Sequence, residues 1–182
     1  SVKLFARDEC PVETPYETLA KMRPVFRKDG VGTAGNASII SDGAAAVVVM
    51  SREKADELGC TIMAEIGAQA SAGIELQHVL IAPILAIPKV LKKEGITIND
   101  VDIFEINEAF SGSSVAINRV LGLDEAKVDV NGGSVALGHP IGASGARLLT
   151  TLLYQMRRQD ARTGLVSLCL GGGEAVALVV NR

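Results

Sequence analysis

The 182-residue chain has few aromatic residues, few cysteines and few histidines. Aromatic residues make up 3% of it and tryptophan is absent, so its core must be built from alanine, valine, isoleucine and leucine. No apolar run approaches the roughly 20 residues of a membrane-spanning helix, and the first residues do not resemble a signal peptide. A net charge of −3 gives no electrostatic reason to bind nucleic acid or an anionic membrane. We therefore expect a cytoplasmic protein with neither a nucleic-acid nor a membrane partner.

The three cysteines, Cys10, Cys60 and Cys169, are widely spaced and form no Cys-x-x-Cys pair. An odd, scattered set fits neither a disulfide framework nor a zinc site. His78 and His139 are the only histidines, and neither has a second metal ligand nearby in the sequence. We expect free thiols in a reducing compartment, with no metal and no cofactor.

Helical and strand patterns alternate along the chain after a proline-containing stretch over residues 1–35. In that stretch one short helix is expected over 14–22, capped by Thr14. Caps, prolines and glycines predict the later helices over 51–59, 83–95, 108–121 and 141–158. Apolar runs predict strands over 44–50, 61–70, 102–106, 165–170 and 175–180, with an extended piece at 128–130. This order predicts an α/β fold: a mixed, mostly parallel sheet with helices packed on its faces and an antiparallel last pair of strands.

Cys169 ends an apolar strand and is followed, after Leu170, by three glycines. A cysteine at a strand end can simply be buried in the core, since free cysteines are often buried. Successive glycines weaken a strand, however, and they permit something to approach the backbone closely. Exposed N–H groups in such a turn can bind a developing oxyanion. Both interpretations stay open from the residues alone.

His139 lies between Gly138 and Pro140, just before a helix start that is rich in small residues. A lone histidine is more often structural, but a helix N-terminus disfavours the imidazolium and leaves a neutral N–H donor. Asn107 and Glu108 follow strand 102–106, at the sheet edge where α/β folds bind ligands. Asn107 is also a suitable N-cap for the following helix, and Glu108 is a suitable negatively charged residue for its first turn. The glycine spacing after residue 138 matches neither common nucleotide-binding pattern.

Taken together, these segments resemble the thiolase family, the acyl-CoA:acetyl-CoA C-acyltransferases. The matching segments, in the family's order and spacing, are GTAGNAS (32–38), SDGAAA (41–46), NEAF (107–110), GGSVALGHPIGASGAR (132–147) and CLGGG (169–173). The resemblance covers essentially the whole chain but only about the second half of a thiolase. It implies a thiolase-like layered fold: 1–30 end a covering loop excursion, 31–60 return to the first domain, and 61–182 form the C-terminal domain, the second of two related domains.

The resemblance also implies roles for individual residues. Asn107 would hold a water that forms, with His139, the oxyanion hole for a thioester enolate. Cys169 would be the acid/base that takes the α-proton of acetyl-CoA or protonates the departing carbanion. The Gly171 N–H would contribute to a second oxyanion hole, for the tetrahedral intermediate of acyl transfer. A thiol is suited to this proton transfer, because hydrogen-bond donors and helix termini can lower its pKa toward neutral.

Three more residues would contact substrate: Ser38 the pantetheine arm of coenzyme A, and Ala109 and Phe110 the acyl group. Glu108 would support the site through hydrogen bonds. At 174, where methionine or a small residue is common in the family, stands Glu174. Coenzyme A thioesters would be substrates rather than cofactors.

The family's acyl-accepting cysteine belongs to the half that this chain lacks, and neither Cys10 nor Cys60 has matching surroundings. We therefore expect half of an enzyme that condenses two acetyl-CoA molecules to acetoacetyl-CoA, or catalyses the reverse thiolysis. It would need a first-half thiolase chain or domain and would be a homo- or hetero-oligomer. Two alternatives stay open: a self-contained Cys169/His139 thioester hydrolase, and a non-catalytic module that binds coenzyme A.

Overall fold

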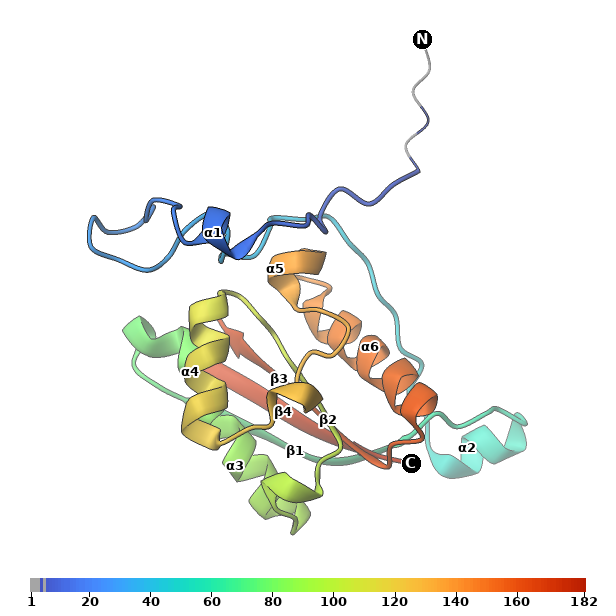
Figure 1. Ribbon diagram of the computed structural model, residues 1–182. Helices are drawn as coiled ribbons and strands as arrows, with labels where there is room; N and C mark the ends of the chain where they lie inside the picture. Colours follow the sequence, from blue (N-terminus) through green and yellow to red (C-terminus); the bar gives the residue numbers. More distant parts are fainter. Residues whose placement is uncertain (1–3, 5) are drawn as a thin grey trace.

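A computed structural model describes residue 4 and residues 6–182, so residues 1–3 and 5 of the expected covering segment lie outside the described residues. The chain forms a four-stranded sheet with helices on both faces (Figure 1). The elements in order are α1 (Tyr16–Leu19), α2 (Arg52–Glu57), β1 (Glu65–Gly73), η1 (Leu76–Ile81), α3 (Pro83–Glu94), η2 (Ile98–Asp100), β2 (Ile103–Ile106), α4 (Ser111–Leu121), η3 (Glu125–Lys127), α5 (Ser134–Leu137), α6 (Ser144–Gln159), β3 (Thr163–Leu170) and β4 (Glu174–Asn181), where η marks a 3₁₀-helix.

The strand order is β1-β4-β3-β2. β2 and β3 are parallel, while β4 runs antiparallel to both β3 and β1. Three strands therefore point the same way, but β4 lies between two of them. The mixed α/β sheet is confirmed, whereas the expectation that it is mostly parallel is wrong: only one of its three pairings is parallel. The hairpin after Leu170 places β4 antiparallel beside β3, and β1 pairs with the other edge of β4.

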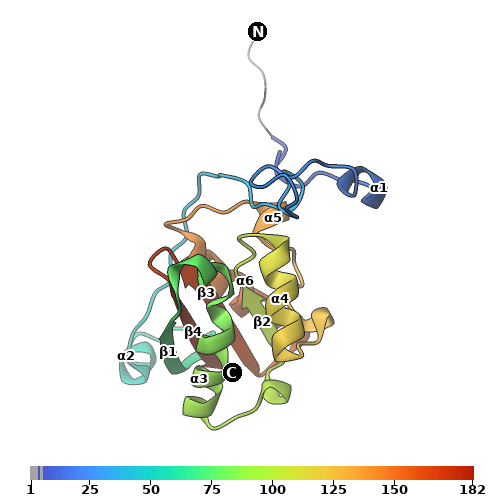
Figure 2. The ribbon, with the colours of Figure 1, turned by 90° about the vertical axis from the view of Figure 1, so that its left-hand side faces the viewer.

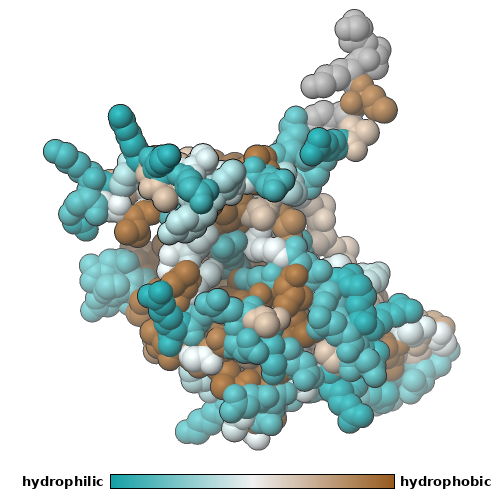
Figure 3. Space-filling model, viewed as in Figure 1, coloured by the Kyte–Doolittle hydropathy of each residue, from teal (hydrophilic) through white to brown (hydrophobic). Residues whose placement is uncertain are grey.

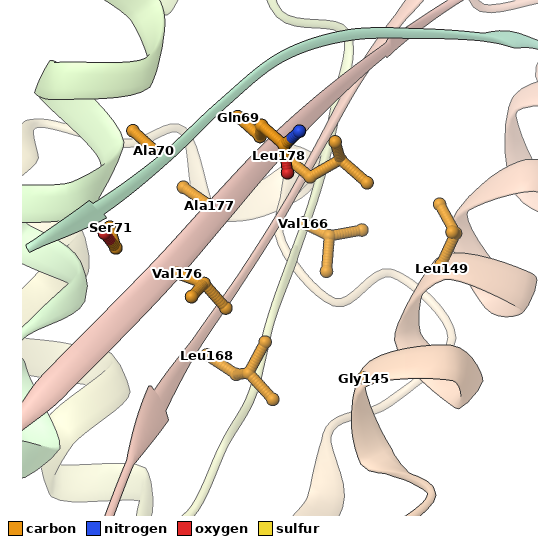
Figure 4. Close-up of a pocket in the computed structure, with 10 residues that line it drawn as sticks. All are labelled: Gln69, Ala70, Ser71, Gly145, Leu149, Val166, Leu168, Val176, Ala177 and Leu178. Atoms are coloured by element: carbon orange, nitrogen blue, oxygen red, sulfur yellow. The ribbon is translucent and has the colours of Figure 1, made fainter. Parts of the chain in front are cut away.

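The two faces of the sheet are covered unequally. On one face, α3 packs against β1, β3 and β4, and α4 packs beside α3; their core includes Phe104, Ile117 and Leu165. On the other face, α6 alone packs over β2 and β3, through Leu148, Leu152 and Met156 among others. Beside α6 a groove of about 460 Å³ remains over β1 and β4 (Figure 4). Its apolar walls include Leu149, Val166, Leu168, Val176 and Leu178.

Local signals set most helix boundaries. Pro83 stands in the first turn of α3, and Gly95 ends that helix in the left-handed conformation with φ of 81°. The serine hydroxyl of Ser51 accepts the Lys54 N–H and caps α2. The helices expected from 108 and 141 start later, at Ser111 and Ser144. The chain around Asn107 and His139 is therefore irregular, which leaves these side chains free to form a site.

Two capping predictions are wrong. Phe110, not Asn107, stands at the N-cap of α4, because the Asn107 side chain bonds to Ser134 instead. In the N-terminal segment Pro15 occupies the N-cap of α1, and the Thr14 hydroxyl donates to the Val12 carbonyl. Both polar side chains found other backbone or side-chain partners, as short polar residues often do.

Two strand predictions need correction. β1 covers Glu65–Gly73 rather than 61–70, because its partner β4 spans Glu174–Asn181 and pairs with it only over that length. The apolar run over 44–50 is not a strand, and Val48 is 82% exposed. A strand needs a hydrogen-bonding neighbour, and no described strand lies beside this run. Its composition is that of a buried strand, but its surroundings in this chain are solvent.

We expect the isolated chain to self-associate at micromolar concentration. Ile40, Val48 and Val49 are exposed, the groove beside α6 is open, and hydrophobic residues are visible among the hydrophilic ones on the face in Figure 3. Contiguous apolar surface of this kind drives association. Sedimentation velocity over a concentration series measures it, with the double variant Val48→Ser/Val49→Ser as the less associating comparison. A stable monomer across that range contradicts the expectation.

Candidate active site

The candidate site lies where the parallel strands β2 and β3 end. Ile106 pairs with Ser167, and the Asn107 N–H donates to the Ser167 carbonyl at 2.9 Å. Asn107 directly follows β2, and Cys169 lies two residues beyond Ser167 on β3. Both residues therefore leave the sheet at the same edge. Figures 1 and 2 show the N-terminal segment, with α1, lying across this end of the domain beside α5.

Asn107 and His139 meet directly, although 32 residues separate them. The Asn107 Nδ2 lies 3.4 Å from His139 Nε2. Its Oδ1 accepts a hydrogen bond of 2.8 Å from the hydroxyl of Ser134, at the start of α5. Asn107 is 5% exposed, so the amide is held in place inside the protein rather than free in solvent.

His139 is held at both ring nitrogens. Its Nδ1 lies 2.7 Å from the hydroxyl oxygen of Ser144, which also lies 3.0 Å from the Pro140 carbonyl. Burial, and then the positive charge of Arg147, lower the pKa of His139 below its ordinary value. Both causes favour the neutral ring, which is the form that the sequence argument expected. The causes are burial and Arg147 rather than the helix N-terminus that the sequence suggested.

The segment 36–43 runs along both motifs. The Ser38 N–H donates to the Ala109 carbonyl at 3.0 Å, and Ala37 forms an antiparallel bridge with Phe110. Further on, the His139 N–H donates to the Ile39 carbonyl at 2.9 Å. Three predicted contact residues, Ser38, Ala109 and Phe110, therefore lie side by side at the edge of the Asn107–His139 pair.

The N-terminal segment reaches the same place. The Phe26 ring packs edge-on against the Phe110 ring, with centroids 5.7 Å apart and planes at 75°. Gly138, with φ of 95°, approaches Ser41 closely, and the Cys10 thiol lies nearby. Only glycine fits at 138, because a side chain would meet the Ser41 hydroxyl in a conformation that other residues rarely adopt.

Cys169 is a half-buried free thiol near the end of β3. Burial raises its pKa above the ordinary value, and its backbone N–H offsets part of that rise. The sequence argument had expected groups around the thiol to lower its pKa.

The turn after β3 requires glycine at 173. Gly173 has a φ of 89°, and the Ile74 carbonyl occupies the position where a side chain would begin. The space beside Gly171 is open. Glu174 is exposed and opens β4.

A buried charged cluster lies behind Asn107, and the sequence argument missed it. Glu105 on β2 is 0% exposed, with a carboxylate oxygen 3.8 Å from Nη1 of Arg147 on α6. Asp129 accepts the Ile106 N–H at 2.9 Å. Burial raises the pKa of Glu105 to about 8, and it raises that of Asp129 to about 7. One signal was available: a charged residue in the middle of DIFEI, a strand that the pattern predicts to be buried.

These raised values predict that the domain loses stability as the pH rises from about 4.5 to 8. In this window folded Glu105 keeps a proton that the unfolded chain, with an ordinary glutamate pKa, has released. The free energy of unfolding should fall by roughly 2 to 5 kcal/mol across it. Urea denaturation at several pH values measures this. Glu105→Gln should flatten the slope, and the exposed Glu17→Gln should not; equal slopes in all three proteins would contradict the assignment.

No helix among the described residues is long and apolar enough to cross a membrane. Nor is any group of three or more His, Cys, Asp or Glu side chains in the described part of the chain arranged to hold a metal ion.

Comparison with known proteins identifies the family. Residues 60–182 match the thiolase C-terminal domain, and residues 2–53 match the thiolase N-terminal domain. The chain belongs to the thiolase family. Curated relatives include an acetyl-CoA acetyltransferase of Pseudomonas aeruginosa, 52% identical over 98% of this chain and 46% of its own length, and one of Allochromatium vinosum, 53% identical over 99% and 46%.

Solved structures agree with this assignment and with the fold. Human mitochondrial 3-ketoacyl-CoA thiolase superimposes with a TM-score of 0.93 at 40% identity, over 96% of this chain and 44% of its own. The Bacillus anthracis acetyl-CoA acetyltransferase gives a TM-score of 0.94 at 45% identity, over 97% and 45%. The chain spans about half the length of the curated relatives that it matches.

Proposed function

We propose that this chain is the C-terminal part of a thiolase that transfers acyl groups between acyl-CoA and acetyl-CoA, and that a first-half chain supplies the nucleophilic cysteine. The observation that carries the proposal is the contact between Asn107 and His139 at the sheet edge that also holds Cys169. In this proposal residues 1–30 end a covering loop, 31–60 complete the first domain, and 61–182 form the C-terminal domain. Acetyl-CoA and longer acyl-CoA thioesters are its substrates, and no cofactor takes part.

In the condensing direction, Cys169 as thiolate removes a proton from the α-carbon of acetyl-CoA. The electron pair left on that carbon attacks the acyl carbonyl held on the first-half cysteine. The bond between that carbonyl carbon and the cysteine sulfur then breaks, and the cysteine leaves as a thiolate. Because burial raises the Cys169 pKa in this chain alone, substrate and the first-half chain must bring the groups that favour the thiolate.

His139 and a water held by Asn107 stabilise the enolate oxygen in this scheme. The role needs a proton on His139 Nε2, which follows when the Ser144 hydroxyl donates to Nδ1. When that hydroxyl donates to the Pro140 carbonyl instead, Nδ1 carries the proton and Nε2 can only accept. Ser144 thus selects the tautomer, and substrate binding selects between the two hydroxyl positions.

The other predicted residues fit the same scheme. The Gly171 N–H, in a turn with open space beside it, contributes to the second oxyanion hole. Ser38 lies along the pantetheine arm, and Ala109 and Phe110 line the acyl pocket. Their backbone pairing holds these three positions together.

The need for a first-half chain is supported by what this chain leaves uncovered. The apolar run over 44–50 has no strand partner among the described residues. The groove between α6 and the β1–β4 side of the sheet is apolar and open, with Leu149 facing Val166 across it (Figure 4). A second domain that pairs with the run and fills the groove would bury both surfaces. Assembly as a homo- or hetero-oligomer and residence in the cytoplasm stay predictions.

A self-contained Cys169/His139 thioester hydrolase is less well supported. Its base would need a free ring nitrogen aimed at the thiol, but Asn107 and Ser144 lie at hydrogen-bonding distance from the two His139 nitrogens. The third group that orients the ring is a serine hydroxyl rather than a carboxylate. A non-catalytic module that binds coenzyme A would have no need for this arrangement.

Covalent trapping separates the three functions. The chain is mixed with the first-half segment of the Pseudomonas aeruginosa relative, exposed to labelled acetyl-CoA, quenched in acid and mapped by peptide mass. Label on a first-half cysteine supports the proposal. Label on Cys169 favours the hydrolase, and no label on a complex that binds coenzyme A favours the binding module.

A further inference from the structure

Arg147 is a half-buried arginine, with 19% of its side chain exposed, that the proposed chemistry does not use. It lies on α6, next to Leu148 in the core, and its Nη2 donates to the Ser134 hydroxyl at 3.0 Å. Its Nη1 faces the buried Glu105 carboxylate at 3.8 Å. Burying a guanidinium is costly unless it is paired and hydrogen-bonded, so its place behind the site calls for an explanation.

The polarity of the contacts favours one direction, because Arg147 occupies one of the two acceptor positions of the Ser134 oxygen. A guanidinium only donates, so the Ser134 oxygen must accept from Arg147. The single hydroxyl proton of Ser134 is then free to go to Asn107 Oδ1, at 2.8 Å. With Oδ1 committed to Ser134, the Asn107 amide must present Nδ2 on the other side, toward His139. The chain of donors therefore runs one way, from Arg147 to His139.

Glu105 lies beside Arg147 on the strand side, 3.8 Å from Nη1 and without a hydrogen bond to it. Residues two apart on a strand point to the same face, so Glu105 and Asn107 both face the α5–α6 side. Two further carboxylates lie around the cluster: Asp129, bonded to the Ile106 N–H, and Glu108, which accepts the Val135 N–H at 3.1 Å. Arg147 is the one cation among these four buried or half-buried charged groups.

We propose that Arg147 is a positioning residue that acts through Ser134 to hold the Asn107 amide with its NH₂ toward His139. On the proposed function, this orientation keeps donors rather than a carbonyl oxygen facing the enolate, so this last step rests on that function. The orientation itself does not depend on it. Without Arg147 or Ser134, the amide can turn over and face His139 with Oδ1.

Nuclear magnetic resonance on the folded 182-residue chain, carrying Val48→Ser/Val49→Ser to limit self-association, tests the orientation without any activity. In the unchanged protein, the Asn107 side-chain amide protons should show a nuclear Overhauser contact to the His139 ring protons. Arg147→Met and Ser134→Ala should each lose or at least halve that contact. Arg157→Met, an exposed arginine on the same helix, is the matched control and should retain it.

The His139 titration separates positioning from charge. Removing the Arg147 charge raises the His139 pKa in either case, since that charge lowers it. Ser134→Ala keeps the charge, so a rise in the His139 pKa that accompanies a lost amide contact indicates a turned amide, whose oxygen favours the protonated ring. An unchanged amide contact and an unchanged titration in folded Ser134→Ala would overturn the proposal, even if Arg147→Met fails to fold.

Kinetics of the reconstituted enzyme then connect orientation to function. Ser134→Ala should lower kcat for condensation by less than the about 10²- to 10³-fold loss typical of an oxyanion donor, and it should leave KM within about twofold. If the reconstituted enzyme is inactive while the resonance results hold, the proposed function fails and the positioning role stands. If kcat is unchanged while the amide turns, the orientation by Arg147 and Ser134 stands, and its role in catalysis is overturned.

Discussion

Mixing this chain with a first-half thiolase chain is expected to produce thiolysis of acetoacetyl-CoA that neither chain shows alone. The reason is the division of labour in the proposed function, in which Asn107, His139 and Cys169 come from this chain and the cysteine that carries the acyl group comes from the first half. Nucleophilic catalysis needs both in one site. On mixing, the turnover of acetoacetyl-CoA should therefore rise from background to a measurable rate. It should stop increasing near an equimolar ratio of the two chains.

Two controls make the result interpretable. A first-half chain whose nucleophilic cysteine is replaced by alanine should assemble with this chain but give no turnover. The purified 182-residue chain must be shown by mass spectrometry to be free of any partner. Robust cleavage of acetoacetyl-CoA by that chain alone would sink the half-enzyme account.

In the reconstituted enzyme, Cys169→Ser should lower condensation by about 10²- to 10⁴-fold, the usual contribution of a general acid/base. A hydroxyl has a far higher pKa than a thiol and is a poor proton shuttle near pH 7. Acylation of the first-half cysteine should survive, because it needs no proton from the α-carbon. Cys60→Ser, an exposed thiol after α2, is the matched control and should leave both steps unchanged.

The sequence was sufficient to place the site but not its support. Asn107, His139 and Cys169 stand next to glycines, prolines and strand ends, which are local signals, and the alternation of strands and helices brings strand ends to one edge. Ser134, Ser144 and Arg147 lie inside the glycine-rich segment 132–147 and Glu105 inside a strand, but their roles depend on contacts between β2, α5 and α6 that no local pattern shows. Only the Glu105 position hinted at them, as a charge inside an apolar strand.

The errors in the fold have the same origin. Strand direction follows from the alternation, and three of the four strands do run the same way. β4 lies between β1 and β3, and no local sequence pattern encodes which strands become neighbours in the sheet. The run over 44–50 has the composition of a buried strand, yet composition cannot supply the neighbour that a strand requires.

The most direct test of the central claim, that Cys169 moves a proton and does not carry the acyl group, uses the reconstituted Cys169→Ser enzyme. Acetyl exchange between acetyl-CoA and labelled coenzyme A is measured beside acetoacetyl-CoA formation in the same preparation. The account predicts near-normal exchange with condensation reduced by about 10²-fold or more. A folded, assembled variant that loses exchange as well would show that Cys169 is the nucleophile and would contradict the account.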